Sequence, residues 1–145
     1  MSTVRTNELG KYIGVLHRLF QIAISRELTL PELNATNANF LLFISEHDQV
    51  TAKQIATELA INKGLVSREL TRLEAAGYIE RQTDAADHRT TWVRITPLGL
   101  QACQTINDLM SRLWAQVLGA SDQGSVETVA SELDLWSKRA EDLQP

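Results

Sequence analysis

Residues 51–99 decide the fold of this chain, and they read TAKQIATELAINKGLVSRELTRLEAAGYIERQTDAADHRTTWVRITPLG. Thr51 and Gln54 have the spacing of a capping box, in which the threonine oxygen accepts from the glutamine backbone and the glutamine side chain reaches back. A short helix is therefore predicted here, and a second helix is predicted after Asn62, a residue type that caps helices. The second helix should end just before Gly77, which suits a left-handed stop. The apolar inner faces are predicted to be Ile55, Ala56, Leu59 and Ala60 in the first helix and Val66, Leu70 and Leu73 in the second.

A pair of strands is predicted after the second helix. Tyr78–Gln82 reads as one strand, and Thr90–Thr96 alternates apolar and polar side chains as the other. The connecting segment, Thr83–His88, is polar and rich in aspartate, so the two strands should form a hairpin. Thr96 followed by Pro97 predicts a new helix, with the threonine as its cap and the proline at its first position. Helix, tight turn, helix and hairpin in this order predict a winged helix-turn-helix, within a mainly α fold that has a small two-stranded β wing.

Long amphipathic helices are predicted on both sides of this stretch. The first runs from about Asn7 to Leu28 and is stopped by Pro31. A second begins after Thr36, read as its N-cap, and is apolar nearly all round, which predicts a buried central helix. Two more helices close the chain, the first of them ending at Gly119. The last helix carries a heptad-like apolar seam: Val126, Val129, Leu133, Trp136, Ala140 and Leu143.

Composition indicates a globular domain, and the charge is unevenly distributed. The chain has 145 residues, of which 43% are hydrophobic and 22% charged, and its net charge is −4. Residues 51–100 carry a net charge of +1, whereas residues 101–145 carry −4, so the middle of the chain is basic enough to meet phosphate. The longest apolar run, Phe40–Ile44, is too short for a membrane span, and the N-terminus has no apolar signal-peptide core. Cys103 is the only cysteine, so a reducing cytoplasm is the expected location.

The second helix of residues 51–99 offers an outward polar face. A helix fits the major groove of DNA, and residues of its first turns reach the base edges. Gly64 and Ser67 are small enough for close approach, and Arg68 suits guanine or phosphate. The alternative is a solvated helix face with Glu69 and Glu74 among its charges. The outward residues are Lys63, Gly64, Ser67, Arg68, Thr71 and Arg72.

Two further groups of residues are candidates for contacts with nucleic acid. Backbone amides at Thr51, Ala52 and Lys53 begin a helix, and helix N-termini bind phosphate. The hairpin tip holds Asp84, Asp87, His88 and Arg89. A tip arginine suits the narrow minor groove, and a neighbouring carboxylate, from Asp84 or Asp87, would orient it by a bidentate bond. An ordinary polar turn is the alternative for this tip.

Four motifs carry a resemblance to a known family. The segments QIATELAI, VSRELTRLEAAGYIER, DAADHR and ITPLG resemble the MarR family of bacterial transcription regulators, most specifically in the D-x-x-D-x-R pattern that ends at Arg89. The resemblance implies a homodimer that binds pseudo-palindromic double-stranded DNA operators, with the second helix in the major groove and Arg89 in the minor groove. It also implies an effector pocket between the winged part and the dimer helices, often for anionic aromatic compounds. His88 departs from the family, where a second arginine is common, and Gly64 replaces a small hydroxyl residue.

A single domain over residues 1–145 is predicted to contain two lobes. Residues 34–96 form the DNA-binding lobe, and residues 1–33 and 97–145 form a helical dimerisation lobe. The first helix and the seam carry more apolar surface than the small core can cover, and an uncovered patch of that size marks an interface. The alternative is that the first and last helices pack on each other within one chain.

The predicted function is therefore a dimeric DNA-binding transcription regulator, a repressor by the commoner mode of the family. The candidate effector residues are Tyr12, for which core packing is favoured, His17 and Arg18. A winged helix that binds a protein partner is the alternative function. No enzyme, cofactor or metal site is predicted, because the three histidines lie far apart and no catalytic or ligand spacing occurs. Cys103 is in phase with the apolar residues of its helix and is expected in the core.

Overall fold

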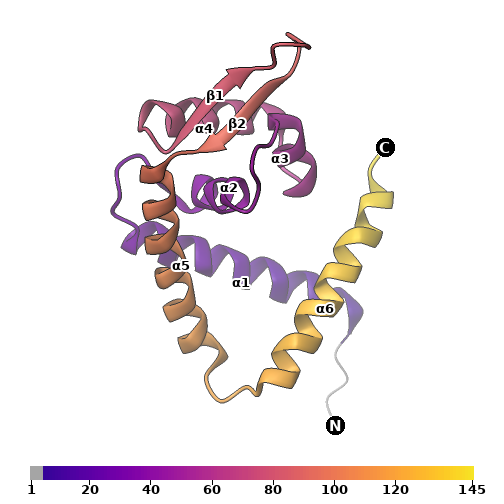
Figure 1. The fold of residues 1–145 in the computed structure, drawn as a ribbon. Coiled ribbons are helices and arrows are strands. Elements are labelled where there is room, and N and C mark those ends of the chain that lie inside the picture. Colours follow the sequence, from indigo (N-terminus) through magenta and orange to yellow (C-terminus); the bar gives the residue numbers. More distant parts are fainter. Residues whose placement is uncertain (1–4) are drawn as a thin grey trace. The chain divides into compact units, whose positions relative to one another are not determined.

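The computed structural model describes residues 5–145 and shows a mainly helical protein with one two-stranded antiparallel sheet (Figure 1). By packing, the chain divides into two compact units, residues 1–110 and 111–145. The predicted winged helix-turn-helix is confirmed in the first unit. The elements are α1 (Thr6–Glu27), α2 (Ala35–Ser45), α3 (Ala52–Glu58), α4 (Lys63–Ala75), β1 (Ile79–Thr83), β2 (Thr91–Ile95), α5 (Pro97–Leu118) and α6 (Gln123–Ala140), followed by a 3₁₀ turn at Glu141–Leu143.

The core of the first unit is built around α2. Phe40, Leu41 and Ile44 are completely buried, which confirms the expectation of an apolar central helix. This helix packs against α1 on one side and against α3, α4 and β2 on the other, as Figure 1 shows. Burial of each such side chain contributes about 1.5–3 kcal/mol. The inner faces of the neighbouring elements add Ile55, Val66, Leu70, Leu73, Val93 and Ile106.

The helix caps agree with the sequence at two positions and differ at a third. Thr51 and Gln54 form the expected capping box, and Asn62 caps α4 through a hydrogen bond from the Gly64 amide. The N-cap of α2, however, is Asn34 and not Thr36. The Asn34 side chain accepts from the amides of Thr36 and Asn37 at 2.9 and 2.8 Å, so the helix begins earlier than predicted. Asn34 is the cap because the Asn37 side chain in turn accepts a hydrogen bond from the Asn34 amide.

The turn between α3 and α4 begins earlier in the chain than the predicted apolar face of α3 required. Helix α3 ends at Glu58, Leu59 is its half-buried C-cap, and Ala60 is exposed with a φ of 53°. A left-handed alanine turns the chain directly into Ile61 and the next cap. The inner face of α3 is therefore limited to Ile55 and Ala56, and the prediction that Ala60 belongs to it was wrong.

The hairpin is fastened to the segment that precedes α3. Strands β1 and β2 pair from Ile79 opposite Ile95 to Thr83 opposite Thr91. Val50 extends the sheet by one residue, since the amides and carbonyls of Val50 and Val93 exchange hydrogen bonds of 3.0 and 2.7 Å. Arg94 adds a fork onto the Gln49 amide oxygen at 3.1 and 2.6 Å. Tyr78, predicted to start the strand, is a buried residue whose hydroxyl donates to the Pro31 carbonyl.

Apolar side chains remain exposed on α1. Only Ile24 of this helix is buried, and Tyr12, for which core packing was favoured, is 51% exposed. The prediction of a core position for Tyr12 was therefore wrong for the single chain. The other large exposed apolar residues of α1 are Leu9, Ile13, Val15, Leu16, Leu19 and Ile22.

The second unit consists of the end of α5, the turn at Gly119 and α6. Gly119 has a φ of 55° and ends α5 as predicted, and Asp122 caps α6 by accepting from the Ser125 amide. None of the residues of α6 is buried. A groove of about 420 Å³ runs between the two helices and is lined mainly by Trp114, Leu118, Val126, Val129 and Leu133. Over residues 5–145, no helix combines the length and apolar character that crossing a membrane requires.

Candidate nucleic-acid interface

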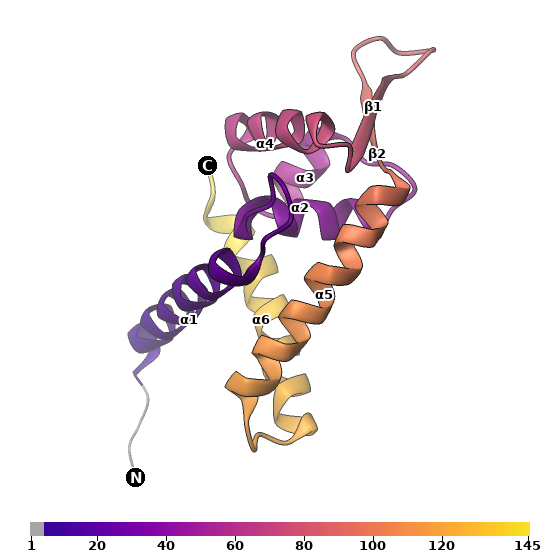
Figure 2. The same ribbon diagram turned by 90° about the vertical axis from the view of Figure 1, so that its left-hand side faces the viewer.

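Helix α4 divides into a buried face and an exposed polar face. Val66, Leu70 and Leu73 are buried as predicted. In Figure 2 the helix lies beside the hairpin, which projects beyond it. The exposed residues recur at steps of three and four, so they share one side of the helix. They are the six residues predicted from the sequence, Lys63, Gly64, Ser67, Arg68, Thr71 and Arg72.

The lack of a side chain at Gly64 is explained by the cap at the start of α4. A Cβ at this position would lie 3.0 Å from the Asn62 Oδ1 atom, which accepts from the Gly64 amide at 2.8 Å. A side chain there would press on the cap that starts α4. The glycine therefore allows the tight cap, and it leaves the backbone of the first turn open to close approach.

One charged residue of α4 is buried. Glu69, which the alternative interpretation placed among solvated charges, is only 8% exposed and accepts a 3.0 Å hydrogen bond from the Asn37 side chain of α2. Arg72 lies beside it, with its Nη1 atom 3.8 Å from Glu69 and its Nε atom 3.6 Å from Glu32. Sequence reasoning missed Asn37 and Glu69 because partners 32 residues apart leave no local pattern. The one available signal was helical phase, since Glu69 precedes Leu70 and lies three residues after the buried Val66.

A second ion pair joins α4 to the hairpin. Arg81 of β1 donates to Glu74 at 2.9 Å and to the Thr71 hydroxyl at 3.4 Å. The hydrogen bond from Arg81 holds the pKa of Glu74 below its usual value. Thr71 in turn donates to the Ser67 carbonyl at 3.1 Å. Glu74 is therefore tied to the hairpin, and Arg81 is a residue that the sequence did not single out.

Asp84 organises the hairpin tip. Its Oδ1 atom accepts from the amides of Ala86 and Asp87 at 2.8 and 3.0 Å, and its Oδ2 atom accepts from the Trp92 indole at 2.8 Å. The hydrogen bond from Trp92, followed by those from the two amides, lowers the pKa of Asp84. Asp84 therefore fixes the loop and the indole, and it does not contact Arg89.

Asp87 is the carboxylate beside Arg89. It accepts from the Arg89 amide at 3.1 Å and from the Thr90 hydroxyl at 3.2 Å, and its Oδ1 atom lies 3.8 Å from the Arg89 Nε atom. This is a single contact and not the bidentate bond that the sequence suggested. The Arg89 side chain is 97% exposed. The tip therefore presents a guanidinium on a backbone fixed by two aspartates.

The arrangement at Asp84 predicts the effect of one substitution. In Asp84→Asn one carboxylate oxygen becomes an amide N–H₂ group, which donates hydrogen bonds and does not accept them. Either the Trp92 indole or the pair of loop amides therefore loses its acceptor. We expect faster hydrogen exchange of the Trp92 indole, measured by NMR, while the exchange of core amides stays unchanged. Asp48→Asn, an exposed aspartate outside the hairpin, is the matched control. Unchanged indole exchange in Asp84→Asn would contradict this role.

The same carboxylate gives a pH dependence of known sign. A pKa that is lowered in the folded state stabilises the fold above the ordinary aspartate value of about 3.9, and this contribution is lost as the pH falls through the folded value. The Trp92 indole resonance is therefore expected to stay constant from neutral pH down to that value and to shift only in stronger acid. A shift of this resonance between pH 5 and 7 would contradict the assignment.

The start of α3 offers fewer donors than predicted. The Thr51 amide already donates to the Gln54 side chain at 2.8 Å, so it is not free for phosphate as the sequence suggested. The Lys53 side chain is exposed. Its contact with DNA stays a prediction.

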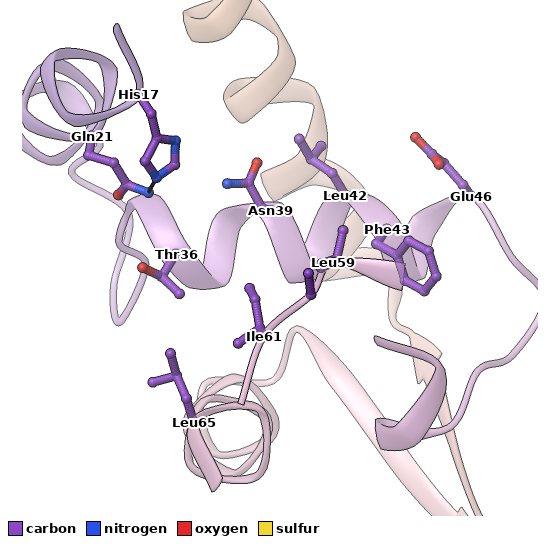
Figure 3. A pocket seen from close by; sticks show the side chains of 11 residues that line it. His17, Gln21, Thr36, Asn39, Leu42, Phe43, Glu46, Leu59, Ile61 and Leu65 are labelled. Atoms are coloured by element: carbon purple, nitrogen blue, oxygen red, sulfur yellow. Dashed lines mark hydrogen bonds between the residues drawn. The ribbon is translucent and has the colours of Figure 1, made fainter. Parts of the chain in front are cut away.

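A pocket lies between α1, α2 and the α3–α4 turn (Figure 3). Its volume is about 630 Å³, and Leu42, Phe43, Leu59, Ile61 and Leu65 provide its apolar lining. The polar lining comes from His17, Gln21, Thr36, Asn39 and Glu46. His17 and Gln21 lie 3.2 Å apart and come from α1. Of the three effector candidates, the structure places His17 in this pocket but neither Tyr12 nor Arg18, whose guanidinium lies close to Gly14 of its own helix.

Cys103 lies in the core, as expected. It is buried, and its thiol donates to the Leu41 carbonyl at 3.6 Å. Burial raises the pKa of this thiol, outweighing a hydrogen bond with Ser45. We therefore expect a thiol reagent to label the native protein at least about tenfold more slowly than the urea-unfolded chain, as followed by absorbance. Equal rates would show that the cysteine is open to redox chemistry.

Within residues 5–145, no group of three or more histidine, cysteine, aspartate or glutamate side chains is arranged to hold a metal ion.

Comparisons with known proteins agree on one family. A family model described as the MarR family matches residues 32–90. The chain is similar to the HTH-type transcriptional regulator YwhA of Bacillus subtilis, with 29% identity over 99 residues, which cover 62% of this chain and 71% of YwhA. Across the curated relatives, the chain spans from 49% to 71% of their length.

Solved structures show the same fold. A MarR transcriptional regulator from Methanosarcina mazei has a TM-score of 0.85 at 22% identity, with 96% of this chain and 100% of that chain covered. FabT of Streptococcus pneumoniae, solved in complex with DNA, has a TM-score of 0.74 at 18% identity, with 97% and 100% covered. At these identities the likeness concerns the fold.

Proposed function

We propose that this chain is a transcriptional regulator of the MarR family, which binds a pseudo-palindromic DNA operator as a homodimer and represses transcription. The observation that carries the proposal is the exposed polar face of α4 beside a hairpin tip that presents Arg89. Such a helix fits the major groove, and an arginine on a fixed tip suits the minor groove next to it. In the proposal, Lys63, Gly64, Ser67, Arg68 and Thr71 approach the bases or phosphates, and Asp87 and His88 support Arg89 at the backbone. The structure of FabT with DNA supports this use of the fold.

The homodimer is supported by exposed apolar surface in both units. In α1 seven large apolar residues face solvent in the single chain, and α6 exposes Val129, Leu133, Leu135 and Trp136. Apolar patches of this extent are rare on monomeric proteins and mark interfaces. We assign residues 1–33 and 97–145 to the dimerisation lobe and residues 34–96 to the DNA-binding lobe. Light scattering should give about twice the 16.2 kDa of the chain at micromolar concentration, and a stable monomer would contradict the assignment.

Release from DNA by a small aromatic or anionic effector completes the proposal. The α1–α2 pocket has a volume within the range of small-molecule sites, which is about 300–1,000 Å³. Its lining includes Ile61 and Leu65, from the turn and the first helical turn that lead into α4. His17 supplies a polar anchor at the α1 side. A ligand there would contact the start of the helix that reads DNA.

The function is tested by selection of DNA with the purified protein. Genomic fragments are bound at two salt concentrations, recovered and sequenced. We expect an inverted repeat whose half-sites lie one helical turn apart, roughly 10 base pairs, and whose recovery falls steeply with salt. A folded dimer that enriches no sequence would contradict operator binding and favour a protein partner. The relatives found are transcription regulators and not enzymes, so catalysis is not part of the proposal.

A further inference from the structure

Arg68 and Arg72 lie one helical turn apart on α4, but their surroundings differ. Arg72 has carboxylates on two sides, Glu32 at 3.6 Å and Glu69 at 3.8 Å, and its side chain is 48% exposed. Arg68 is exposed and has no carboxylate within ion-pair distance in the part of the chain that the structure describes. A phosphate that approaches Arg72 therefore meets two negative charges for one positive charge.

Glu69 cannot move away from this position. It is buried, and Asn37, which is completely buried on α2, donates to its Oε2 atom at 3.0 Å. A buried carboxylate is costly unless a cation or hydrogen-bond donors compensate it. Asn37 is neutral, so Arg72 supplies the positive charge. Arg72, whose Nη1 atom lies 3.8 Å from the Glu69 carboxylate, is thus the compensating cation on its inner side.

The backbone of Glu32 is held in place by the same asparagine. The Asn37 side chain also donates to the Glu32 backbone carbonyl at 2.8 Å. Glu32 has a φ of 62°, a left-handed conformation that costs energy for a residue other than glycine and persists only where neighbours impose it. One buried amide group therefore holds the Glu69 carboxylate and the backbone of Glu32, the two residues that flank Arg72. The loop before α2 and the DNA-facing helix are joined through this contact.

We propose that Glu69, together with Asn37 and Glu32, acts as a positioning residue that withholds Arg72 from DNA phosphates. This inference rests on the proposed DNA binding by α4, and it removes Arg72 from the predicted set of contacts. Binding to DNA of any sequence grows with each phosphate that is neutralised. A phosphate contact adds to the binding of every sequence about equally, so an arginine held back in this way lowers affinity for the operator and for random DNA alike. The network thereby reduces the part of the binding that does not depend on sequence.

The test compares Glu69→Gln and Glu32→Gln with the wild-type protein, on the selected operator and on a random duplex, across a series of salt concentrations. Glutamine at position 69 still accepts from Asn37 but carries no charge. Each released Arg72 should steepen the slope of log affinity against log salt by about one and raise affinity for the random duplex about tenfold at 0.1 M salt. Glu58→Gln, an exposed change of the same charge on α3, is the matched control and should leave the slope unchanged.

A double substitution assigns the effect to Arg72. Arg72→Gln alone should keep the wild-type slope, and Glu69→Gln should add nothing to the slope in that background. Glu32→Gln approaches the network from the solvent side, so it provides the test if thermal unfolding shows Glu69→Gln to be poorly folded. A lower slope in Arg72→Gln would overturn the inference, as would equal slopes in Glu69→Gln, Glu32→Gln and Glu58→Gln. A wild-type protein that binds neither duplex would overturn the proposed function as well.

Discussion

Replacement of Arg89 by alanine is expected to weaken binding to the selected operator by about 1–3 kcal/mol, roughly a 5- to 150-fold rise in Kd. The side chain is 97% exposed and makes only a 3.8 Å contact with Asp87, so the fold does not depend on it. The loss arises because the narrow minor groove concentrates negative potential, and the guanidinium is the group that the hairpin presents to it. Fluorescence anisotropy with the operator duplex measures the effect.

The control for Arg89 has to remove the same charge elsewhere. Arg139→Ala removes an exposed arginine near the end of α6, outside the proposed DNA-binding lobe. Its operator affinity should stay within about twofold of the wild type at 0.1 M salt, because α6 belongs to the proposed dimerisation lobe. Equal affinities in Arg89→Ala and wild type would show that the hairpin tip does not enter the groove.

Replacement of Gly99 by alanine is expected to lower the free energy of unfolding by about 3 kcal/mol, the upper end of the usual range for overpacking. A Cβ at this position would collide with the Tyr78 carbonyl oxygen and would lie 2.7 Å from an Ile95 side-chain atom. The same carbonyl accepts the Thr96 amide at 3.0 Å, and the Thr96 hydroxyl accepts the Gly99 amide at 3.1 Å. A shift of the Tyr78 backbone or of the end of β2 would therefore disturb the hydrogen bonds that join β2 to the start of α5.

Urea unfolding followed by circular dichroism, at a fixed protein concentration, measures the loss. Gly10→Ala is the matched control, because a Cβ there meets nothing within 4 Å. Since alanine is favoured over glycine inside helices, this control should be at least as stable as the wild type, by up to about 1 kcal/mol. Gly99→Ala with wild-type stability would show that α5 can shift away from Tyr78 without cost.

The sequence was sufficient for features that depend on neighbouring residues. The capping box at Thr51, the cap at Asn62, the left-handed Gly77 and the helix start at Thr96 all involve partners within four residues, and all are confirmed. The N-cap of α2 was misplaced because two candidate caps, Asn34 and Thr36, lie close together. Only the reciprocal hydrogen bond, which the Asn37 side chain accepts from the Asn34 amide, decides between them.

Features that depend on distant partners were not predictable from the sequence. Glu69 looks like a surface residue until Asn37, 32 positions earlier, is placed beside it. Arg81 and Val50 gain their roles from the packing of the hairpin on α4 and on the segment before α3. On the exposed face of α4 the helical period was enough to identify the candidate residues. It did not reveal that two carboxylates, those of Glu32 and Glu69, lie within 4 Å of Arg72.

The fastening of the hairpin has a consequence for how a conformational change would be observed. Val50 and Gln49 hold β2 to the segment before α3, and Arg81 holds β1 to α4. We therefore expect these elements to move together. In the proposed homodimer, the variable that the proposed effector would alter is the separation of the two winged parts. Fluorescent labels on the two hairpins should report a change in distance between protomers, while distances within each winged part stay constant.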